Sequence, residues 1–428
     1  MRDLIIKGKY ILTMDENLSV IKDGFVAVAG NKIIAAGAGD EIKNYNAGKI
    51  IDAGNSIVMP GLINTHTHAA MVYFRGLADD LPLQEWLEKH IWPAEAKYVN
   101  EEFVRRASEL ACLEMLKSGT TCFNDMYFFE EITAEIAKKI GMRAVIGEGI
   151  LNFPTPDCKS PEEAIDKTIR LAEKFKHDEL INIALAPHSI YTCDKNILIK
   201  AKQEAEKYNL LLHIHAGETK KETENCKKQH CKSPAAYLDS IGFLGNNVIA
   251  AHSVWLDDND IEIYQNRGVK ISHCPISNMK LASGIMPLSK MKNITISLGT
   301  DGAASNNTLD LFSDMRACAL LHKISEMDPT AASAWQVVQM ATINGAKALG
   351  LENKIGSLEI GKQADIITVN LDKPHLTPIY DPYSHLVYCA NGSDVENVII
   401  NGKIVVRNRE AKILDEEKIL KQAMEFIL

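Results

Sequence analysis

The sequence lacks long apolar runs, and it also lacks any block of charges of one sign. No stretch of about 18 or more consecutive apolar residues occurs in the 428 residues, which argues against a membrane-spanning helix. Residues 1–7 show neither the apolar core nor the small-residue cleavage site of a signal peptide. The formal net charge of -9 is spread along the chain, so neither nucleic acid nor an anionic membrane is expected as a partner.

Cysteine is sparse for a disulfide framework. The nine cysteines are scattered and odd in number, which is typical of a reducing compartment, and we therefore expect a cytoplasmic protein. Cys226 and Cys231, with His230 between them, are the one group that offers soft metal ligands. Their segment is rich in lysine and polar, so a solvated surface is the favoured interpretation over a second metal site.

Two styles of sequence alternate along the chain. Residues 1–58 read as short strands separated by turns such as Gly30-Asn31. After that, eight strand candidates alternate with helical stretches whose outer faces are charged. Eight β-then-α units predict a parallel (β/α)₈ barrel of the TIM type. The predicted strands are residues 57–66, 120–126, 143–151, 181–188, 210–215, 248–252, 269–273 and 294–299.

The strand-and-turn style returns at the end of the chain. A helix is predicted over residues 331–349, followed by strands at 364–369 and a hairpin around Asn401-Gly402. Because both ends of the chain look alike, we expect a small composite β-sandwich domain formed by both termini. The predicted limits are 1–58 and 359–428 for this domain and 59–358 for the barrel.

A His-x-His pair ends the first predicted barrel strand. Alternate side chains of a strand share a face, so His66 and His68 point the same way. Two imidazoles at a strand end form half of a metal site. For this pair alone, two hydrogen-bonded histidines in a polar pocket would be the simpler interpretation, and the other strand ends decide the matter.

Ionisable residues also end three further strands. Strand five ends with His213, His215 and Glu218, strand six with His252, and strand eight with Asp301. Because the active site of such a barrel lies at the C-terminal ends of its strands, these side chains are predicted to meet. His213 lies two residues deeper than His215, so we predict His215 as the ligand and His213 as a core residue.

Three neutral imidazoles and one carboxylate suit a borderline divalent cation. Zn²⁺ is the first choice, with Fe²⁺ or Mn²⁺ as alternatives. Such a cation lowers the pKa of bound water to about 7 and provides hydroxide at neutral pH. Strand four, residues 181–188, holds no Lys, Asp or Glu that could bridge a second cation, so one metal per subunit is expected. The predicted ligands are His66, His68, His215 and Asp301.

Acid–base chemistry is expected beside this metal. Glu218 follows His215 by three residues and would stand next to the bound water as an acid or base. His252 and Asp301 can also hold that water. These three residues are the predicted catalytic groups.

Taken together, these motifs resemble the amidohydrolase superfamily. The resemblance implies a metal-dependent hydrolase barrel joined to a composite β-domain, and the His-x-x-Glu motif is typical of its mononuclear deaminases. The stretches that carry it are residues 59–68, His215-x-x-Glu218, His252, Thr300-Asp301-Gly302 and residues 356–365.

Within the superfamily, the chain is similar to the methylthioadenosine/S-adenosylhomocysteine deaminases, including those of the 5′-deoxyadenosine deaminase type. That family has a Trp and, nine residues later, a Glu, which match Trp86 and Glu95. The resemblance implies that Glu95 binds the ribose hydroxyls, whereas the sequence alone favours a solvated helix residue. His188 matches a histidine that contacts the adenine ring, and Ser305 matches a ligand-contacting position.

The chain departs from the family at one place. Members that favour S-adenosylhomocysteine carry arginines after strand three, but no arginine occurs here between Arg143 and Arg170. The segment 147–153 offers one anion, Glu148, which we expect to face the 5′ end of the substrate. The departure favours adenosines with a small or neutral 5′ group.

The resemblance implies hydrolytic deamination of adenine nucleosides to the inosine analogues and ammonia by a metal-bound hydroxide. The expected substrates are 5′-deoxyadenosine, methylthioadenosine, adenosine and S-adenosylhomocysteine. Glu218 would protonate N1, Asp301 would carry the water proton to the leaving amine, and His252 would orient the hydroxide; Glu218 and Asp301 thereby also contact the substrate. We expect the nucleoside substrate to be the binding partner. We also expect the protein to be a homo-oligomer.

Two kinds of alternative compete with this interpretation. One is a related hydrolase, either a deaminase of guanine or a pyrimidine or a triazine-type hydrolase. The other is a catalytically inactive amidohydrolase-like scaffold. Inactive relatives lose ligands, whereas all four predicted ligands and Glu218 are present here, which argues against the scaffold.

Overall fold

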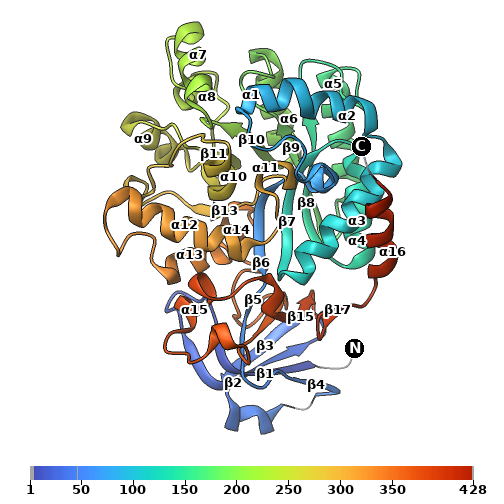
Figure 1. Cartoon of the computed structure of the whole chain (residues 1–428), viewed down its shortest axis with the longest axis vertical. Coiled ribbons are helices and arrows are strands. Elements are labelled where there is room, and N and C mark those ends of the chain that lie inside the picture. Colours follow the sequence, from blue (N-terminus) through green and yellow to red (C-terminus); the bar gives the residue numbers. More distant parts are fainter. Residues whose placement is uncertain (1–3, 46, 427–428) are drawn as a thin grey trace.

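A computed structural model describes residues 4–45 and 47–426 of the chain. It contains an eight-stranded parallel sheet curled into a nearly closed barrel and a nine-stranded mixed sheet beside it (Figure 1). The barrel order runs without interruption from β13 back to β6, as eight successive β-then-α units require. The strands are β6 (Leu62–Thr67), β7 (Thr120–Tyr127), β8 (Arg143–Ile150), β9 (Ile181–Pro187), β10 (Leu211–Ala216), β11 (Val248–His252), β12 (Lys270–His273) and β13 (Ile296–Leu298).

The predicted barrel is confirmed, with one correction at its start. The predicted strand 57–66 is two strands, because β5 (Ser56–Pro60) ends where Gly61 intervenes before β6. A Cβ on Gly61 would lie 2.1 Å from the Thr121 side chain, so only glycine fits this close approach. β5 belongs to the mixed sheet, where it pairs with β1 and β14.

The mixed sheet is built from both ends of the chain, as predicted. Its order is β17-β16-β15-β14-β5-β1-β2-β3, and β4 pairs with β1. Figure 1 shows the C-terminal strands beside the N-terminal ones, below the barrel. The strands are β1 (Leu4–Leu12), β2 (Val20–Ala29), β3 (Lys32–Ala38), β4 (Lys49–Asp52), β14 (Ile366–Asn370), β15 (Val395–Ile400), β16 (Lys403–Arg407) and β17 (Glu410–Ala411).

A buried ion pair ties the barrel to the C-terminal segment. The guanidinium of Arg143, at the start of β8, donates from Nε to Asp365 Oδ2 at 2.8 Å and from Nη2 to Gln363 Oε1 at 2.7 Å. Both charged side chains are buried. Removing either partner would leave an uncompensated charge inside the protein, so this pair locks the two parts together.

Helices cover the outside of the barrel strands, whose apolar side chains form the main core. In the described part of the chain, no helix has the length and apolar character that crossing a membrane would need. The longer helices are α3 (Glu101–Lys117), α4 (Glu130–Ile140), α5 (Pro161–Phe175), α6 (Lys195–Tyr208), α7 (Lys220–His230), α9 (Asp258–Arg267), α12 (Leu311–Glu326) and α16 (Glu416–Glu425). The shorter ones are α8 (Pro234–Ser240), α10 (Pro275–Lys280), α11 (Ala303–Asn306) and α15 (Pro382–Tyr388).

The helix predicted over 331–349 is broken into α13 (Ala334–Met340) and α14 (Ile343–Ala348). The carbonyl of Ala341 accepts a hydrogen bond from the N–H of Ile63 on β6 at 2.8 Å, and Thr342 leaves helical geometry. A tertiary hydrogen bond therefore overrides the helical pattern of the local sequence.

A covering segment follows β6 and crosses the C-terminal end of the barrel. It consists of the helical turn η2 (Ala69–Phe74), then α1 (Leu83–Trp86), the π-helical turn η3 (Leu87–Ile91) and α2 (Trp92–Tyr98). Figure 1 shows α1 and α2 at the end of the barrel opposite the mixed sheet. This segment supplies much of one wall of the cavity described next.

Candidate active site

The four predicted ligands converge at the C-terminal end of the barrel. Asp301 Oδ1 lies 3.4 Å from His66 Nε2 and 3.2 Å from His68 Nε2, and His215 Nε2 lies 3.3 Å from His68 Nε2. Backbone contacts produce this meeting, because the N–H of Asp301 donates to the carbonyl of His66 at 3.0 Å. Asp301, which follows the last barrel strand, therefore lies directly beside His66 on the first barrel strand.

Each of the three histidines is held through Nδ1, so that Nε2 faces the centre. His68 Nδ1 donates to the carbonyl of Met126 at 2.5 Å, and His215 Nδ1 donates to the carbonyl of His188 at 2.7 Å. His66 Nδ1 lies 2.8 Å from Nε2 of His213. Such outer partners fix the orientation of imidazoles that bind metals. His213 is buried below the site, as predicted for a core residue.

The three distances above fit a tetrahedral divalent cation, because ligands about 2.0–2.1 Å from a tetrahedral Zn²⁺ lie about 3.3 Å from one another. His66, His68 and Asp301 form one described group of ligand atoms, and His66, His215 and His252 form another. Among the described residues, His66 Nε2 is buried without a hydrogen-bond partner. Such an atom costs free energy unless something binds it. The donor set and the orphaned nitrogen therefore both suit a metal ion.

The electrostatics of the cluster point the same way. Burial lowers the pKa of His66 to about 4, so its ring is neutral and has a free lone pair. Burial also opposes a charge on His68, but the adjacent carboxylate of Asp301 outweighs it and raises the pKa of His68 to about 9. The cluster attracts positive charge, as a cation site must.

His252, at the end of β11, adds a further imidazole to the cluster. Its ligand atom groups with those of His66 and His215, all within 4.8 Å of one another. Nδ1 of His252 lies 2.9 Å from Nδ2 of Asn278, and Nε2 lies 3.9 Å from Glu218 Oε2. Burial lowers its pKa to about 4, which leaves a neutral ring.

Backbone strain marks two of these positions. His252 has φ of 69° and Asp301 has φ of 62°, in the left-handed region that residues with a Cβ rarely adopt. Such conformations persist only where the surrounding structure enforces them, and they cluster at functional sites. Both strand ends are therefore bent to aim a side chain.

Glu218 follows β10 and is buried at this end of the barrel. Burial raises the pKa of its carboxyl to about 8, and the nearby charge of Asp301 adds to this effect. The loop is held by Glu222, whose carboxylate accepts the N–H groups of Gly217 at 3.1 Å and Glu218 at 2.8 Å. A protonated carboxyl thus lies in a fixed position beside the imidazoles.

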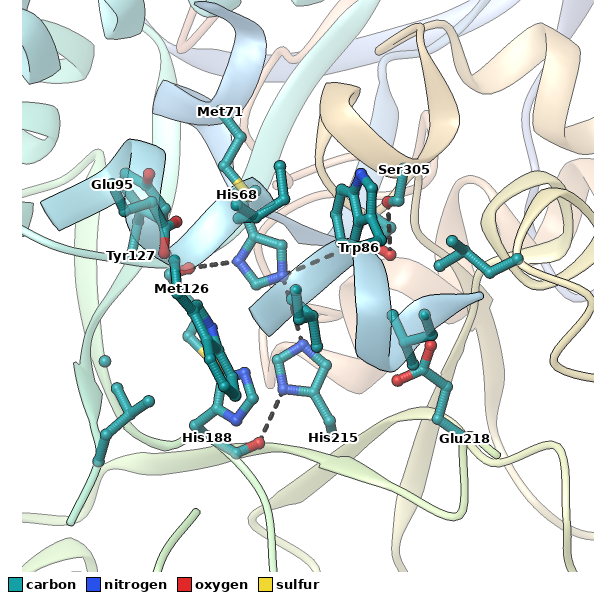
Figure 2. Close-up of a pocket in the computed structure, with 18 of the residues that line it drawn as sticks. His68, Met71, Trp86, Glu95, Met126, Tyr127, His188, His215, Glu218 and Ser305 are labelled. Carbon is teal, nitrogen blue, oxygen red and sulfur yellow. Dashed lines mark hydrogen bonds and ion pairs between the residues drawn. The ribbon is translucent and has the colours of Figure 1, made fainter. Parts of the chain in front are cut away.

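A cavity opens directly above the cluster. The empty space there is about 720 Å³, its open mouth included. Figure 2 shows Glu95 and Tyr127 on one side of His68 and Glu218 on the other. Apart from the polar residues discussed here, the wall is mainly apolar and aromatic: Met71, Leu83, Leu87, Ile91, Trp92, Met126, Phe128, Leu151 and Leu281.

The covering segment brings Trp86 and Glu95 into this wall, and both are buried. The expectation from sequence alone that Glu95 is a solvated helix residue is therefore wrong. Burial raises the pKa of Glu95 to about 7, while the neighbouring Tyr127 hydroxyl works in the opposite direction. A buried carboxylate is costly unless a partner binds it.

His188 and Ser305 also line the cavity, as predicted. His188 Nδ1 lies 2.9 Å from the Thr192 hydroxyl, and burial lowers the pKa of the ring to about 3. The Ser305 hydroxyl donates to Asp301 Oδ2 at 2.8 Å. Ser305 thus contacts the carboxylate as well as the cavity, a link that its sequence position did not reveal.

The expectation that Glu148 faces the 5′ end of the substrate is wrong. Gly149 lines the cavity, so the alternation along β8 turns Glu148 to the opposite face. There it is fully buried and accepts the N–H of Glu130 at 3.2 Å. Burial and the nearby Asp157 hold the pKa of Glu148 well above its usual range.

Two other clusters do not form metal sites by their geometry. Cys226 is buried and Cys231 is exposed. Among the described residues, the ligand atoms of these two cysteines and His230 do not lie close enough together to form a metal-binding group. A second cluster contains His273, Cys318 and His322, in which the two Nε2 atoms lie 3.1 Å apart. Neither Nδ1 atom has a partner among the described residues, whereas histidines that bind metals almost always donate from their second nitrogen.

Comparison with known proteins agrees with this geometry. A model of the amidohydrolase family matches residues 57–405. A 5-methylthioadenosine/S-adenosylhomocysteine deaminase from Thermodesulfovibrio yellowstonii is 49% identical, with 99% of this chain and 98% of that protein covered. A 5′-deoxyadenosine deaminase from Methanosarcina acetivorans is also 49% identical, with 99% and 97% covered. An adenosine deaminase from Xanthomonas campestris, solved with bound zinc, superposes with a TM-score of 0.97 at 36% identity and 99% and 97% coverage.

The barrel and the imidazole cluster define a metal-dependent hydrolase of the (β/α)₈ class. The chain belongs to the amidohydrolase family. The family predicted from the sequence motifs is therefore confirmed.

Proposed function

We propose that this protein deaminates adenine nucleosides by hydrolysis. Its substrates are 5′-deoxyadenosine, methylthioadenosine, adenosine and S-adenosylhomocysteine, which become the inosine analogues with release of ammonia. One observation carries the proposal: a single cavity joins the imidazole cluster to the proton-carrying Glu218. The named activities of relatives that are 49% identical over nearly the whole chain support it.

The metal centre in this proposal is mononuclear. His66, His68, His215 and Asp301 would hold one divalent cation per subunit, with Zn²⁺ as the first choice and Fe²⁺ or Mn²⁺ as alternatives. The zinc bound in the Xanthomonas campestris relative supports that choice. When bound, the cation makes water acidic enough to serve as a nucleophile near neutral pH.

The protein's own groups then move the protons. Glu218 donates its proton to N1 of the purine, which makes C6 electrophilic. Asp301 accepts one proton from the attacking water and transfers it to the departing amine. The remaining hydroxyl proton passes to Glu218 as C6=O forms, so Glu218 regains its proton, one water enters and one ammonia leaves. His252 donates a hydrogen bond to the same water. General acid–base contributions of this kind are typically worth about 10²–10⁴-fold each.

The remaining cavity residues bind the nucleoside. Glu95 would accept the ribose hydroxyls, with the Tyr127 hydroxyl beside it. His188 would contact the adenine ring, and Trp86 and Ser305 would complete the wall. The placement of Glu95 and Glu218 on opposite sides of His68 supports this order, because a nucleoside carries its ribose and its C6 amine at opposite ends (Figure 2).

An ultraviolet assay tests the proposal, since deamination changes purine absorbance. We expect turnover of 5′-modified adenosines and none of guanine, cytosine or triazines. Turnover of one of these other compounds without activity on any adenosine would favour the related hydrolases. A protein that binds metal and converts none of the compounds would be the inactive scaffold.

Metal stoichiometry is the first prediction. Elemental analysis of the purified protein should find one divalent transition metal per chain, because the four ligands form one tetrahedral set. Removing the metal with a chelator should abolish turnover, and adding Zn²⁺ should restore it. Two metals per chain, or full activity in a protein stripped of metal, would contradict the assignment.

The second prediction concerns ribose recognition. Glu95→Ala should raise KM for adenosines by roughly 10- to 100-fold and leave any slow turnover of free adenine unchanged. A hydrogen bond to a charged group is worth about 1.5–3 kcal/mol. Free adenine has no ribose and cannot form this hydrogen bond, so its turnover should not depend on Glu95. Glu101→Ala, an exposed position at the start of α3, serves as the control. Equal losses on adenine and on nucleosides would mean that Glu95 only supports the fold.

Location, assembly and domain limits also belong to the proposal. All nine cysteines are free, which supports the cytoplasm as the compartment. A homo-oligomer is proposed and can be tested by light scattering. We propose the domain limits 1–58 with 359–428, and 59–358. Met59 and Pro60, the last two residues of β5, still pair with β14 in the mixed sheet.

A further inference from the structure

Helix α10 brings two adjacent polar side chains beneath the active site. The Ser277 hydroxyl donates to Asp301 Oδ2 at 2.6 Å, and Asn278 Nδ2 lies 2.9 Å from His252 Nδ1. Both side chains are buried, and neither belongs to the cavity wall. They touch the groups proposed to move protons and do not line the space for substrate, so any influence on the reaction acts through those groups.

The partner at Nδ1 divides the histidines of the site into two kinds. Backbone carbonyls face Nδ1 of His68 and His215. A carbonyl only accepts hydrogen bonds, so Nδ1 carries the proton when these rings are neutral, and Nε2 is then the atom with a lone pair for metal. His252 differs, because the amide nitrogen of Asn278 faces its Nδ1.

An amide nitrogen only donates hydrogen bonds, so Nδ1 of the neutral His252 ring must accept one. The single ring proton then lies on Nε2, the atom 3.9 Å from Glu218 Oε2. This tautomer can donate a hydrogen bond into the site, but it has no lone pair on Nε2 for a metal. His252 thus lies beside His66 and His215 as a hydrogen-bond donor.

We propose that Asn278 is a positioning residue that fixes the Nε2–H tautomer of His252 and so keeps it a hydrogen-bond donor rather than a metal ligand. The inference deepens the proposed deamination and rests on it for the role of His252. The tautomer itself is a property of the folded protein and can be measured without any turnover.

The substitution Asn278→Asp replaces a hydrogen-bond donor with an acceptor and leaves the shape of the side chain nearly unchanged. A carboxylate only accepts hydrogen bonds, so it would hold the proton on Nδ1 and turn the lone pair of Nε2 into the site. A catalytic histidine held in the wrong tautomer loses on the order of 10⁴ in kcat in a serine protease. Here we expect kcat to fall at least about 100-fold while KM changes less than about threefold. Asn278→Ala removes the donor without imposing the opposite tautomer, so a loss of about tenfold is expected.

A matched control is Asn293→Asp, which adds the same charge at an exposed position and should behave as wild type. Zinc content and thermal unfolding of each variant show whether metal and fold are retained. If Asn278→Asp keeps more than half of the wild-type kcat, then the amide oxygen faces His252 and the proposal fails. Activity of the wild type on adenosines tests the proposed function separately.

Nuclear magnetic resonance of the zinc-loaded wild type tests the tautomer directly. With ¹⁵N-labelled histidine, the His252 signals are identified by their loss in His252→Gln. We expect a protonated, pyrrole-type Nε2 and an unprotonated, pyridine-type Nδ1, and the reverse assignment in Asn278→Asp. A pyrrole-type Nδ1 in the wild type would overturn the proposal even if the aspartate variant failed to fold.

Discussion

Replacing Glu218 with glutamine is expected to lower kcat on adenosines by at least about 100-fold, with metal content and folding unchanged. The amide keeps the shape of the side chain but has no acidic proton to give to N1, and general acid catalysis is worth about 10²–10⁴-fold. The expectation follows from burial, which raises the pKa of Glu218 to about 8 and keeps the carboxyl protonated at neutral pH. Steady-state kinetics with elemental analysis measures the effect.

Glu224→Gln is the control for this prediction. Glu224 lies on the exposed side of α7, six residues further along the same segment, so the same chemical change there should leave kcat unaltered. Loss confined to kcat/KM with normal kcat would place Glu218 in substrate binding alone. If Glu218→Gln keeps a tenth or more of the wild-type rate, another residue protonates N1.

Selectivity at the 5′ end is expected to favour small, neutral groups. We predict that kcat/KM for 5′-deoxyadenosine or methylthioadenosine exceeds that for S-adenosylhomocysteine by about 100-fold, or about 2.7 kcal/mol. No lysine or arginine lines the described cavity, so a carboxylate entering it would lose hydration without a cationic partner. A methyl or methylthio group instead gains apolar contact, at about 0.8 kcal/mol per buried methylene-sized group.

Arg143 does not alter this expectation, because it lies at the start of β8 and is engaged with Asp365. Phe153 offers a test, since it is partly exposed and packs on Trp92 of the cavity wall with ring centroids 5.8 Å apart. Phe153→Arg should narrow the gap between the substrates about tenfold, and Phe153→Leu should leave it unchanged. Competition kinetics that show S-adenosylhomocysteine as the best substrate of the wild type would contradict the prediction.

The sequence and the structure agree most closely where periodicity carries the information. Each predicted barrel strand lies within a few residues of an observed one. The strand ends bring His66, His68 and Asp301 together, and they bring His215 and His252 to His66. The differences fall where contacts between distant segments override local pattern. Gly61 separates β5 from β6 because Thr121 leaves no room for a side chain. The hydrogen bond from the N–H of Ile63 to the carbonyl of Ala341 interrupts the predicted helix.

The direction of side chains was harder to predict than their position along the chain. Glu148 was expected to face the substrate because it is the one anion of the segment 147–153, which was matched to the 5′ end of the substrate. Strand alternation turns it away. Glu95 was expected to be solvated from the local pattern alone, and only the packing of the covering segment buries it. Asn278 and Ser277 carried no signal in the sequence, because their partners lie 26 and 24 residues away on other elements.

The sequence by itself determined the barrel, and its motifs resembled those of the family to which the chain belongs. The barrel and the meeting of polar residues at the strand ends could be predicted because a strand repeats every two residues and parallel strands end at a common edge. Only the tertiary structure decided the protonation of Glu218, the orientation of Glu148 and which nitrogen of each histidine faces the site. Those properties arise from burial and from single hydrogen bonds between segments far apart in the chain, which no local pattern records.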